Sequence, residues 1–222
     1  MDYEHARRRM VRYQIKGRGI RDLPLLAAMG EVPREEFVVE QFRPAAYRDG
    51  PIPIGYGQTI SQPYVVALMT EALRIREGDR VLEVGTGSGY QAAILAAMGA
   101  EVFTIERQVQ LAQEAQQNLE RLGFDEVTVR TGDGSVGWPE EAPFDGILVT
   151  ASGPTIPTPL LEQLKEGGRL IIPVEEHRGR QKLLRILRRA DGRYEREELG
   201  EVAFVPLIGQ EGWERQGRGY WQ

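Results

Sequence analysis

The sequence predicts an α/β fold in which helices cover both faces of a mostly parallel sheet. Short apolar runs alternate with segments of helical periodicity from residue 81 to residue 174, and this alternation is typical of a parallel sheet. Glycines at 85, 87 and 89 stand between the first of these apolar runs and a helical pattern. A length of 222 residues is enough for one well-filled domain and short for two.

Each element is expected from its own pattern. Pro63 suits the first turn of a helix, and segment 44–57 is too rich in proline and glycine for regular structure. After residue 174 two apolar runs, 182–189 and 203–208, lack a helix-length segment between them, and the turn at 190–193 favours a hairpin-like antiparallel ending. We expect helices over 4–17, 23–29, 63–75, 89–98, 108–122 and 157–165, and strands over 81–85, 102–106, 127–131, 144–150 and 168–174.

Composition excludes several classes of protein. No apolar run approaches the ~20 residues of a membrane span, and the charged N-terminus does not resemble a signal peptide. The chain has no cysteine, which fits a cytoplasmic location. Its two histidines, His5 and His177, are far apart, so we expect no histidine-based metal centre. The net charge of −5 argues against nucleic acid as a partner.

The glycine turn predicts a nucleoside site. The sequence V-L-E-V-G-T-G-S-G-Y spans residues 81–90, and a strand that turns tightly into a helix points backbone N–H groups at a ligand. A Cβ would block the turn and the ligand's approach. Gly89 comes one residue earlier than in the dinucleotide fingerprint, whose last position is occupied here by Tyr90. This spacing favours S-adenosylmethionine, although a glycine turn without a ligand is the alternative.

Two acidic residues end the next predicted strands. Glu106 ends the run 102–106, roughly twenty residues beyond the turn, where a carboxylate can bind ribose hydroxyls. Asp133 lies in the sequence G-D-G after the next run, where it can accept a hydrogen bond from an adenine amino group. The alternatives are that Glu106 caps the following helix and that Asp133 starts a turn.

A polar, glycine-rich loop over 54–64 precedes the predicted sheet, and long irregular loops in compact domains are usually functional or disordered. Ser61 has no neighbouring base, so it is a poor nucleophile, but its hydroxyl could orient a substrate carboxylate. The alternative is that Ser61 or Gln62 caps the helix that begins at Pro63.

These motifs resemble those of the protein-L-isoaspartate (D-aspartate) O-methyltransferases over roughly residues 8–208. The glycine turn is shared by many methyltransferases, whereas the G-Q-T-I-S-Q-P loop and the F-V-P-L segment are largely specific to this family. The matching motifs are P-I-G-Y-G-Q-T-I-S-Q-P-Y (53–64), V-L-E-V-G-T-G-S-G-Y (81–90), G-D-G-S-V-G-W (132–138), P-F-D-G-I-L-V-T-A (143–151), L-L-E-Q-L-K-E-G-G-R-L (160–170) and F-V-P-L-I-G (204–209).

The resemblance implies the class I S-adenosylmethionine-dependent methyltransferase fold, which is Rossmann-like. We expect a mostly parallel seven-stranded sheet with an antiparallel last strand, preceded by N-terminal helices. A single methyltransferase domain would span 1–208, divided into N-terminal helices and active-site loop (1–78) and sheet core (79–208), with a tail over 209–222. The implied cofactor is S-adenosyl-L-methionine, and the implied partners are damaged proteins and peptides containing L-isoaspartyl residues. We expect a monomer without nucleic acid or membrane partners.

The resemblance also implies roles for individual residues. Ser61 matches the family's active-site serine. The substrate side would be bordered by Thr59, Ile60, Ser61 and Val205. The cofactor contacts would be Gln58, Thr59, Ile60, Gly85, Gly87, Glu106, Asp133 and Gly134, and no metal ligand is implied.

The implied reaction needs no general base. The α-carboxylate of an isoaspartyl residue, with a pKa near ~3.5, is ionised at neutral pH and can attack the methyl group directly. Catalysis would then depend on holding the reacting groups in line in a dry pocket, where Ser61 aims the carboxylate. The methyl ester would afterwards cyclise to a succinimide without the enzyme, which makes the process a repair.

Two other functions fit the same turn: a methyltransferase acting on RNA or a small molecule, and a non-catalytic nucleoside-binding module. Amino-group methyltransferases usually carry an acid- or Asn-headed Pro-Pro-aromatic motif, but this chain has V-T-A-S-G-P at 149–154. A catechol-type enzyme would need metal-holding acids, for which the sequence shows no cluster.

Overall fold

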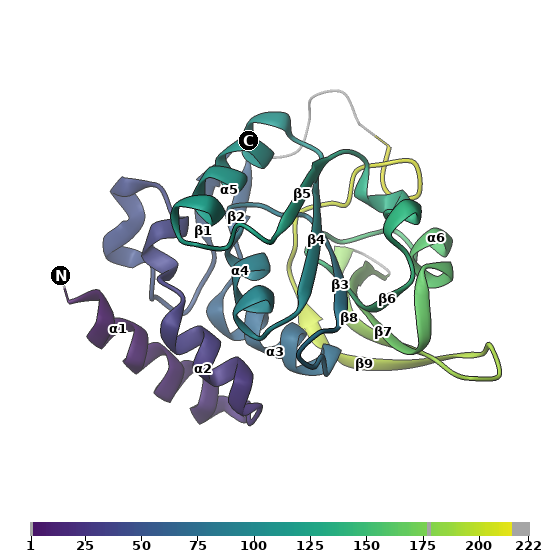
Figure 1. Cartoon of the computed structure of the whole chain (residues 1–222), viewed down its shortest axis with the longest axis horizontal. Helices are drawn as coiled ribbons and strands as arrows, with labels where there is room; N and C mark the ends of the chain where they lie inside the picture. Colours follow the sequence, from purple (N-terminus) through teal and green to yellow (C-terminus); the bar gives the residue numbers. More distant parts are fainter. Residues whose placement is uncertain (1, 177–178, 215–222) are drawn as a thin grey trace.

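The computed structural model describes residues 2–176 and 179–214. Within them, the main sheet has seven strands: β3 (Arg80–Val84), β4 (Glu101–Glu106), β5 (Thr128–Thr131), β6 (Phe144–Val149), β7 (Leu164–Glu175), β8 (Gln181–Arg188) and β9 (Tyr194–Val202). Their order is β5-β4-β3-β6-β7-β8-β9 (Figure 1). The strands from β5 to β7 are parallel to one another, whereas β8 pairs antiparallel with β7 and β9 pairs antiparallel with β8. The mostly parallel seven-stranded sheet and its antiparallel last strand are confirmed.

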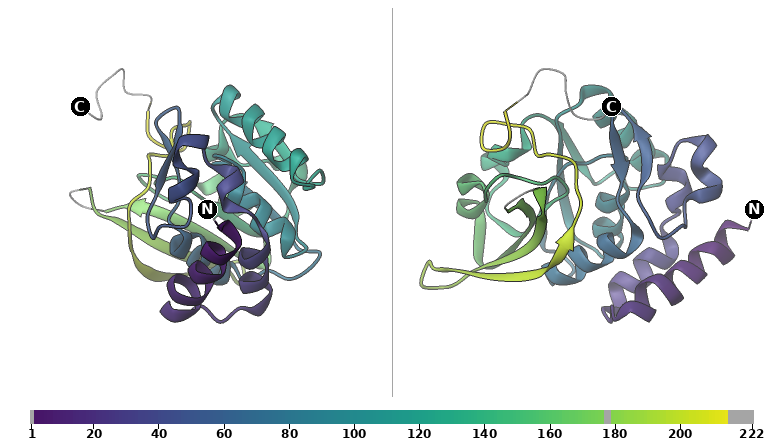
Figure 2. Two further views of the ribbon diagram at one scale, coloured as in Figure 1. Left: turned by 90° about the vertical axis from the view of Figure 1, so that its left-hand side faces the viewer. Right: turned by 180° about the vertical axis from the view of Figure 1, so that it is seen from behind.

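Helices cover both faces of this sheet. They are α1 (Tyr3–Arg9), α2 (Leu23–Glu31), α3 (Pro63–Leu73), α4 (Tyr90–Ala97), α5 (Val109–Arg121) and α6 (Thr158–Glu162). Strand β3 shows the two-sided burial, because Val81 packs in one apolar core with α2, α3 and α4, whereas Leu82 packs in a second core with Leu160 of α6. Helices α1 and α2 lie side by side at one end of the molecule, and the β8–β9 hairpin projects at the other (Figure 1, Figure 2).

The predicted N-terminal helix over 4–17 is helical throughout, but only its first part is an α-helix. The chain continues from α1 through a π-helical segment, Met10–Ile15, into a 3-10 turn, Lys16–Arg18. Helix α6 is shorter than the predicted 157–165, because β7 begins at Leu164, where it pairs with Phe144. Among the described residues, no helix combines the length and the apolar character that a bilayer-spanning segment needs.

The hairpin-like antiparallel ending is present, but the apolar run 203–208 is not its second strand. The hairpin partner of β8 is β9, whose sequence Y-E-R-E-E-L-G-E-V is largely solvent-exposed. The first five residues of this edge strand are exposed, and only Leu199 and Val202 pack partly against the core, so its sequence lacks the regular apolar alternation of a half-buried strand. Segment 203–208 is apolar for a different reason: Leu207 is buried, and the segment crosses the end of the sheet, where Ser152 N–H donates to the Val205 carbonyl at 2.8 Å.

The prediction that segment 44–57 lacks regular structure is also wrong. It contains the end of a 3-10 helix, Glu40–Ala45, and strand β1 (Ile52–Gly55) forms a small hairpin with β2 (Gln58–Ile60). The two turn residues, Tyr56 and Gly57, both have positive φ angles, 53° and 71°, which matches the twist of a tight hairpin. Prolines are tolerated here because a two-stranded ribbon consists only of edge strands.

Candidate active site

A cleft opens at the carboxyl ends of the central strands and contains all the sequence-predicted site residues except Asp133. Strand β3 ends at the cleft in the glycine turn, β4 ends there at Glu106, and segment 205–208 crosses its other side. The predicted residues that line it are Gln58, Thr59, Ile60, Ser61, Gly85, Gly87, Glu106, Gly134 and Val205. In parallel α/β sheets this edge is where ligands bind.

The glycine turn follows β3 and depends on the absence of side chains. Gly85 has a φ of 99°, and a Cβ on it would lie 2.2 Å from Thr150 Oγ1. That hydroxyl donates to the Gly85 carbonyl at 2.7 Å, so the turn is fastened to the end of β6. Gly87 and Gly89 also have positive φ angles. Such backbone angles cost little only for glycine, which explains the alternating pattern.

Glu106 secures the same turn from β4. Its Oε2 accepts a hydrogen bond from Gly87 N–H at 3.1 Å, and its Oε1 accepts one from Gln108 N–H at 3.0 Å. The side chain is buried. Glu106 therefore does cap the start of the following helical segment, which was the structural alternative, and it also stands in the cleft. Each carboxylate oxygen has a further lone pair that could accept from ribose hydroxyls.

Glu83 is a cleft residue that sequence reasoning missed. It lies within β3, is completely buried, and lines the cleft. Thr104 Oγ1 donates to Glu83 Oε2 at 2.5 Å, whereas Oε1 has no partner within the described residues. Burial raises the pKa of Glu83 to about 8. The sequence signal that could have found this residue is the acid inside the apolar run V-L-E-V. Buried polar atoms normally have hydrogen-bond partners, so an acid in a buried strand needs an explanation. The orphaned oxygen suits a ligand group with which a neutral carboxyl can form a hydrogen bond.

The raised pKa of Glu83 predicts a pH-dependent stability. In the unfolded chain this group ionises near its ordinary pKa of 4.5, whereas the folded protein keeps it neutral to about 8. The folded state therefore binds more protons across that window, and the contribution of Glu83 to stability falls as pH rises through it. We expect the free energy of unfolding of Glu83→Gln, relative to that of the native protein, to rise by about 2–3 kcal/mol as the pH is raised from 5 to 7. This follows because one pKa unit corresponds to about 1.36 kcal/mol.

Urea unfolding of both proteins at a series of pH values checks this. The exposed Glu126→Gln, which removes a carboxylate elsewhere on the chain, is the control. A Glu83→Gln curve parallel to the native one would contradict the neutral state of Glu83.

Asp133 is the predicted cofactor residue that does not line the cleft. Its Oδ1 accepts from Ser135 N–H at 2.9 Å and from the Ser135 hydroxyl at 2.7 Å, so it starts a 3-10 turn. Its Oδ2 accepts from Gln210 N–H at 2.7 Å. Asp133 thus anchors the C-terminal segment beside the cleft. Trp213 also docks there, donating from Nε1 to the Ser152 carbonyl at 2.9 Å. The other tail aromatics, Tyr220 and Trp221, lie outside the described residues.

Ser61 lies between the end of β2 and the start of α3, and neither it nor Gln62 caps that helix through its side chain. Gln62 occupies the N-cap position without a capping bond, and its Nε2 donates to Asp49 at 2.7 Å instead. The helix begins at Pro63, as predicted.

A second pocket adjoins the cleft on the side of Ser61. Its walls come from the active-site loop and from the stretch that follows β9. Four residues line both cavities: Thr59, Ser61, Thr150 and Val205. Two adjoining cavities with hydroxyl groups at their boundary are an arrangement in which a group can pass from one bound molecule to another.

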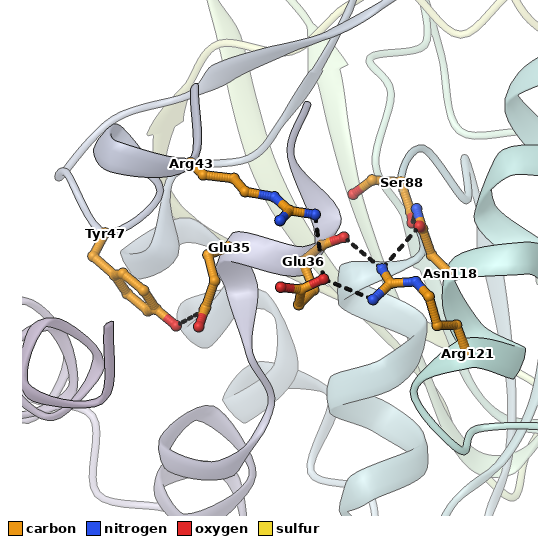
Figure 3. Close-up of polar contacts among 7 residues, drawn as sticks. All are labelled: Glu35, Glu36, Arg43, Tyr47, Ser88, Asn118 and Arg121. Atoms are coloured by element: carbon orange, nitrogen blue, oxygen red, sulfur yellow. Dashed lines mark hydrogen bonds and ion pairs between the residues drawn. The ribbon is translucent and has the colours of Figure 1, made fainter. Parts of the chain in front are cut away.

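A polar network supports the glycine turn from behind. Asn118 on α5 donates from Nδ2 to the Ser88 carbonyl at 3.3 Å, and Arg121 Nη2 lies 3.4 Å from Asn118 Oδ1 (Figure 3). Arg121 also pairs with Glu36 at 2.7 Å. This network connects the turn through α5 to the N-terminal part of the chain.

Removing the Asn118 amide should weaken cofactor affinity. We expect Asn118→Ala to raise the Kd for S-adenosylhomocysteine, the demethylated cofactor, because the Ser88 carbonyl then loses its hydrogen bond. The increase should be roughly 3- to 10-fold, which corresponds to the net free energy of one hydrogen bond. Isothermal titration calorimetry measures this. Gln116→Ala, an exposed position on the same helix, is the control and should leave the Kd unchanged; equal Kd values for both variants would exclude a role for Asn118.

Comparison with known proteins agrees with this geometry. The profile of the family described as Protein-L-isoaspartate(D-aspartate) O-methyltransferase (PCMT) matches residues 5–212. A protein-L-isoaspartate O-methyltransferase 2 from Marinobacter nauticus is 56% identical over 212 residues, covering 96% of this chain and 97% of that protein. A protein-L-isoaspartate O-methyltransferase from Methanoculleus marisnigri is 54% identical, and 94% of each chain is covered.

Two solved structures show the same fold. One, a protein-L-isoaspartate O-methyltransferase, superposes with a TM-score of 0.85 at 32% identity, covering 93% of this chain and 67% of that one. Another, described as a putative protein-L-isoaspartate O-methyltransferase from Plasmodium falciparum in complex with S-adenosyl-L-homocysteine, has a TM-score of 0.78 at 29% identity, covering 91% and 98%. The sheet, the glycine turn and these relatives define an S-adenosylmethionine-dependent methyltransferase. More specifically, the chain belongs to the protein-L-isoaspartate (D-aspartate) O-methyltransferase family.

Proposed function

We propose that the chain methylates the α-carboxylate of L-isoaspartyl residues in damaged proteins, with the cofactor in the cleft and the substrate in the adjoining pocket. The observation that carries this proposal is the shared boundary of the two cavities, formed by Thr59, Ser61, Thr150 and Val205. Hydroxyl groups at this boundary can donate hydrogen bonds to a substrate carboxylate in the pocket, which then faces the methyl donor in the cleft.

The residues of the cleft fit S-adenosylmethionine. The glycine turn leaves room that Cβ atoms would fill, Glu106 presents carboxylate oxygens, and Glu83 has an orphaned buried oxygen. We assign Gly85, Gly87 and Glu106 to the nucleoside. Gln58, Thr59, Ile60 and Gly134 would complete the cofactor site. When bound, S-adenosylmethionine supplies an electrophilic methyl group. Asp133 would act indirectly, because its carboxylate is occupied by main-chain and hydroxyl donors.

The chain's own contribution to the reaction is binding, orientation and exclusion of water. The substrate carboxylate is ionised at neutral pH, so no side chain has to remove a proton. Ser61 donates a hydrogen bond to one carboxylate oxygen and thereby turns the other toward the cleft. The main chain at Val205 binds the substrate backbone, which suits damage that occurs in any sequence. Holding two reactants in this way supplies a large part of a rate enhancement.

Methyl transfer to matched peptides tests the proposal. The protein is given radiolabelled S-adenosylmethionine and either an isoaspartyl peptide or its normal aspartyl twin, and the base-labile methyl ester is counted. We expect labelling of the isoaspartyl peptide alone. Labelling of RNA, or binding of cofactor without any transfer, would instead support a different methyltransferase or a non-catalytic module.

We further propose that residues 1–208 act as one domain and that the protein works as a monomer in the cytoplasm, without nucleic acid. Side chains of the first 78 residues share an apolar core with β3, β6 and β7, which supports the single domain. The absence of cysteine and the net charge of −5 support the location and the lack of nucleic-acid partners. Light scattering on a size-exclusion column tests the monomer.

A further inference from the structure

Arg34 is a buried cation directly behind the active-site loop. It begins the 3-10 turn Arg34–Phe37, and its side chain is completely inaccessible to solvent. Its Nε donates to the Ala46 carbonyl at 2.8 Å, and its Nη2 donates to the Ser61 carbonyl at 2.7 Å. One guanidinium therefore joins the two ends of the loop between the N-terminal helices and α3.

The same guanidinium also contacts the cofactor side of the cleft. Its central carbon lies 4.9 Å from the ring centroid of Tyr90, which lines the cleft and begins α4. Arg34 thus lies between Ser61, at the boundary with the substrate pocket, and Tyr90, beside the glycine turn.

Stability alone is a poor explanation for this arrangement. The hydrogen bonds of Arg34 go to neutral carbonyls, and its Nη1 has no partner within the described residues. Burying a charge in this way is costly, and well-packed apolar side chains often serve as well or better in such positions. What an apolar side chain could not do is hold two carbonyl oxygens at fixed positions with a rigid, planar fork.

We propose that Arg34 is a positioning residue for methyl transfer, which fixes the Ser61 hydroxyl at the boundary of the two cavities by holding the Ser61 carbonyl. The proposal rests on the role of Ser61 proposed above. Ser61 follows a three-residue strand and precedes the first helical residue by two positions, so no regular secondary structure fixes its main chain. Small displacements of a group that aligns reactants are expensive in rate, and Arg34 prevents them.

A double-mutant cycle separates this role from a structural one. Arg34→Lys keeps the charge but cannot donate to both carbonyls through a planar fork. We expect it to lower kcat for the isoaspartyl peptide roughly 10- to 100-fold, with the Kd for S-adenosylhomocysteine changed less than about threefold. In a Ser61→Ala background the same Arg34→Lys change should lower kcat less than about threefold, because Ser61 is the group through which Arg34 acts.

Arg188→Lys is the matched control. Arg188 donates from Nη1 to the carbonyls of Glu162 and Leu164. None of these three residues lines the cleft or the adjoining pocket, so this variant loses similar bonds without touching Ser61. Its kcat should stay near the native value.

Several results would overturn the proposal: a native-like kcat for Arg34→Lys, an equal loss of kcat in both backgrounds, or failure of both Arg34→Lys and Arg34→Met to fold by circular dichroism. Failure of the proposed function is distinguishable, because then the native protein would not methylate the isoaspartyl peptide, or Ser61→Ala alone would retain full activity.

Discussion

Replacing Ser61 with alanine should lower turnover of an isoaspartyl peptide roughly 10- to 1000-fold while leaving cofactor affinity nearly unchanged. The reason is the position of Ser61 at the boundary of the two cavities, where we propose that its hydroxyl orients the substrate carboxylate rather than binding the nucleoside. A steady-state assay gives kcat and KM, and calorimetry with S-adenosylhomocysteine gives the cofactor Kd.

Thr128→Ala is a suitable control, because it removes a hydroxyl from an exposed position on the edge strand β5. It should leave both kcat and Kd at native values. An unchanged kcat in Ser61→Ala would remove Ser61 from the mechanism. A loss of Kd as large as the loss of kcat would place Ser61 in the cofactor site instead.

Replacing Glu106 with alanine should weaken S-adenosylhomocysteine binding by roughly 100-fold. The carboxylate accepts hydrogen bonds from Gly87 N–H and Gln108 N–H, and leaving a buried donor unpaired costs about 1–3 kcal/mol, where each ~1.4 kcal/mol corresponds to tenfold in affinity. Loss of the proposed ribose contact adds to this. The affinity of Glu106→Gln should fall between those of the native protein and Glu106→Ala, because an amide has only one acceptor oxygen for two N–H donors.

The same calorimetry on Glu126→Ala, an exposed acid that precedes β5, controls for the change of net charge. Native-like affinity in Glu106→Ala would show that the turn needs no support from β4, and the assignment of Glu106 to the cofactor would be abandoned.

The central part of the fold could be predicted because its signals are strong and local. Strand β3 is buried on both faces, so it reads as an apolar run interrupted only by Glu83. The glycines after it are required by backbone angles that other residues rarely adopt. Gly85, Gly87 and Glu106 could be placed together from their positions at the ends of neighbouring strands, since parallel strands end at one edge of the sheet.

The missed features depend on contacts that are remote in sequence. Arg34 gives no sign of burial in the pattern V-P-R-E-E-F, and its partners Ala46 and Ser61 are 12 and 27 residues away. Strand β9 resembles a polar loop, because its first five residues are exposed and no regular apolar alternation remains. Asp133 is at the predicted strand end, but its carboxylate binds Gln210, 77 residues further on. Spacing alone could not separate that partner from a ligand.

Strand β9 has a consequence for an enzyme whose proposed clients are damaged, partly unfolded chains. Among residues 2–176 and 179–214, no strand pairs with its outer edge, and such an edge can pair with an extended segment of another chain. Four consecutive residues of β9 are charged: Glu195, Arg196, Glu197 and Glu198. Glu198 forms an ion pair with Lys182 of β8, and Glu197 forms one with Arg185. These charged side chains disfavour the pairing of a client polypeptide with β9 as an eighth strand. We therefore expect this edge to disfavour co-aggregation of the protein with its proposed clients.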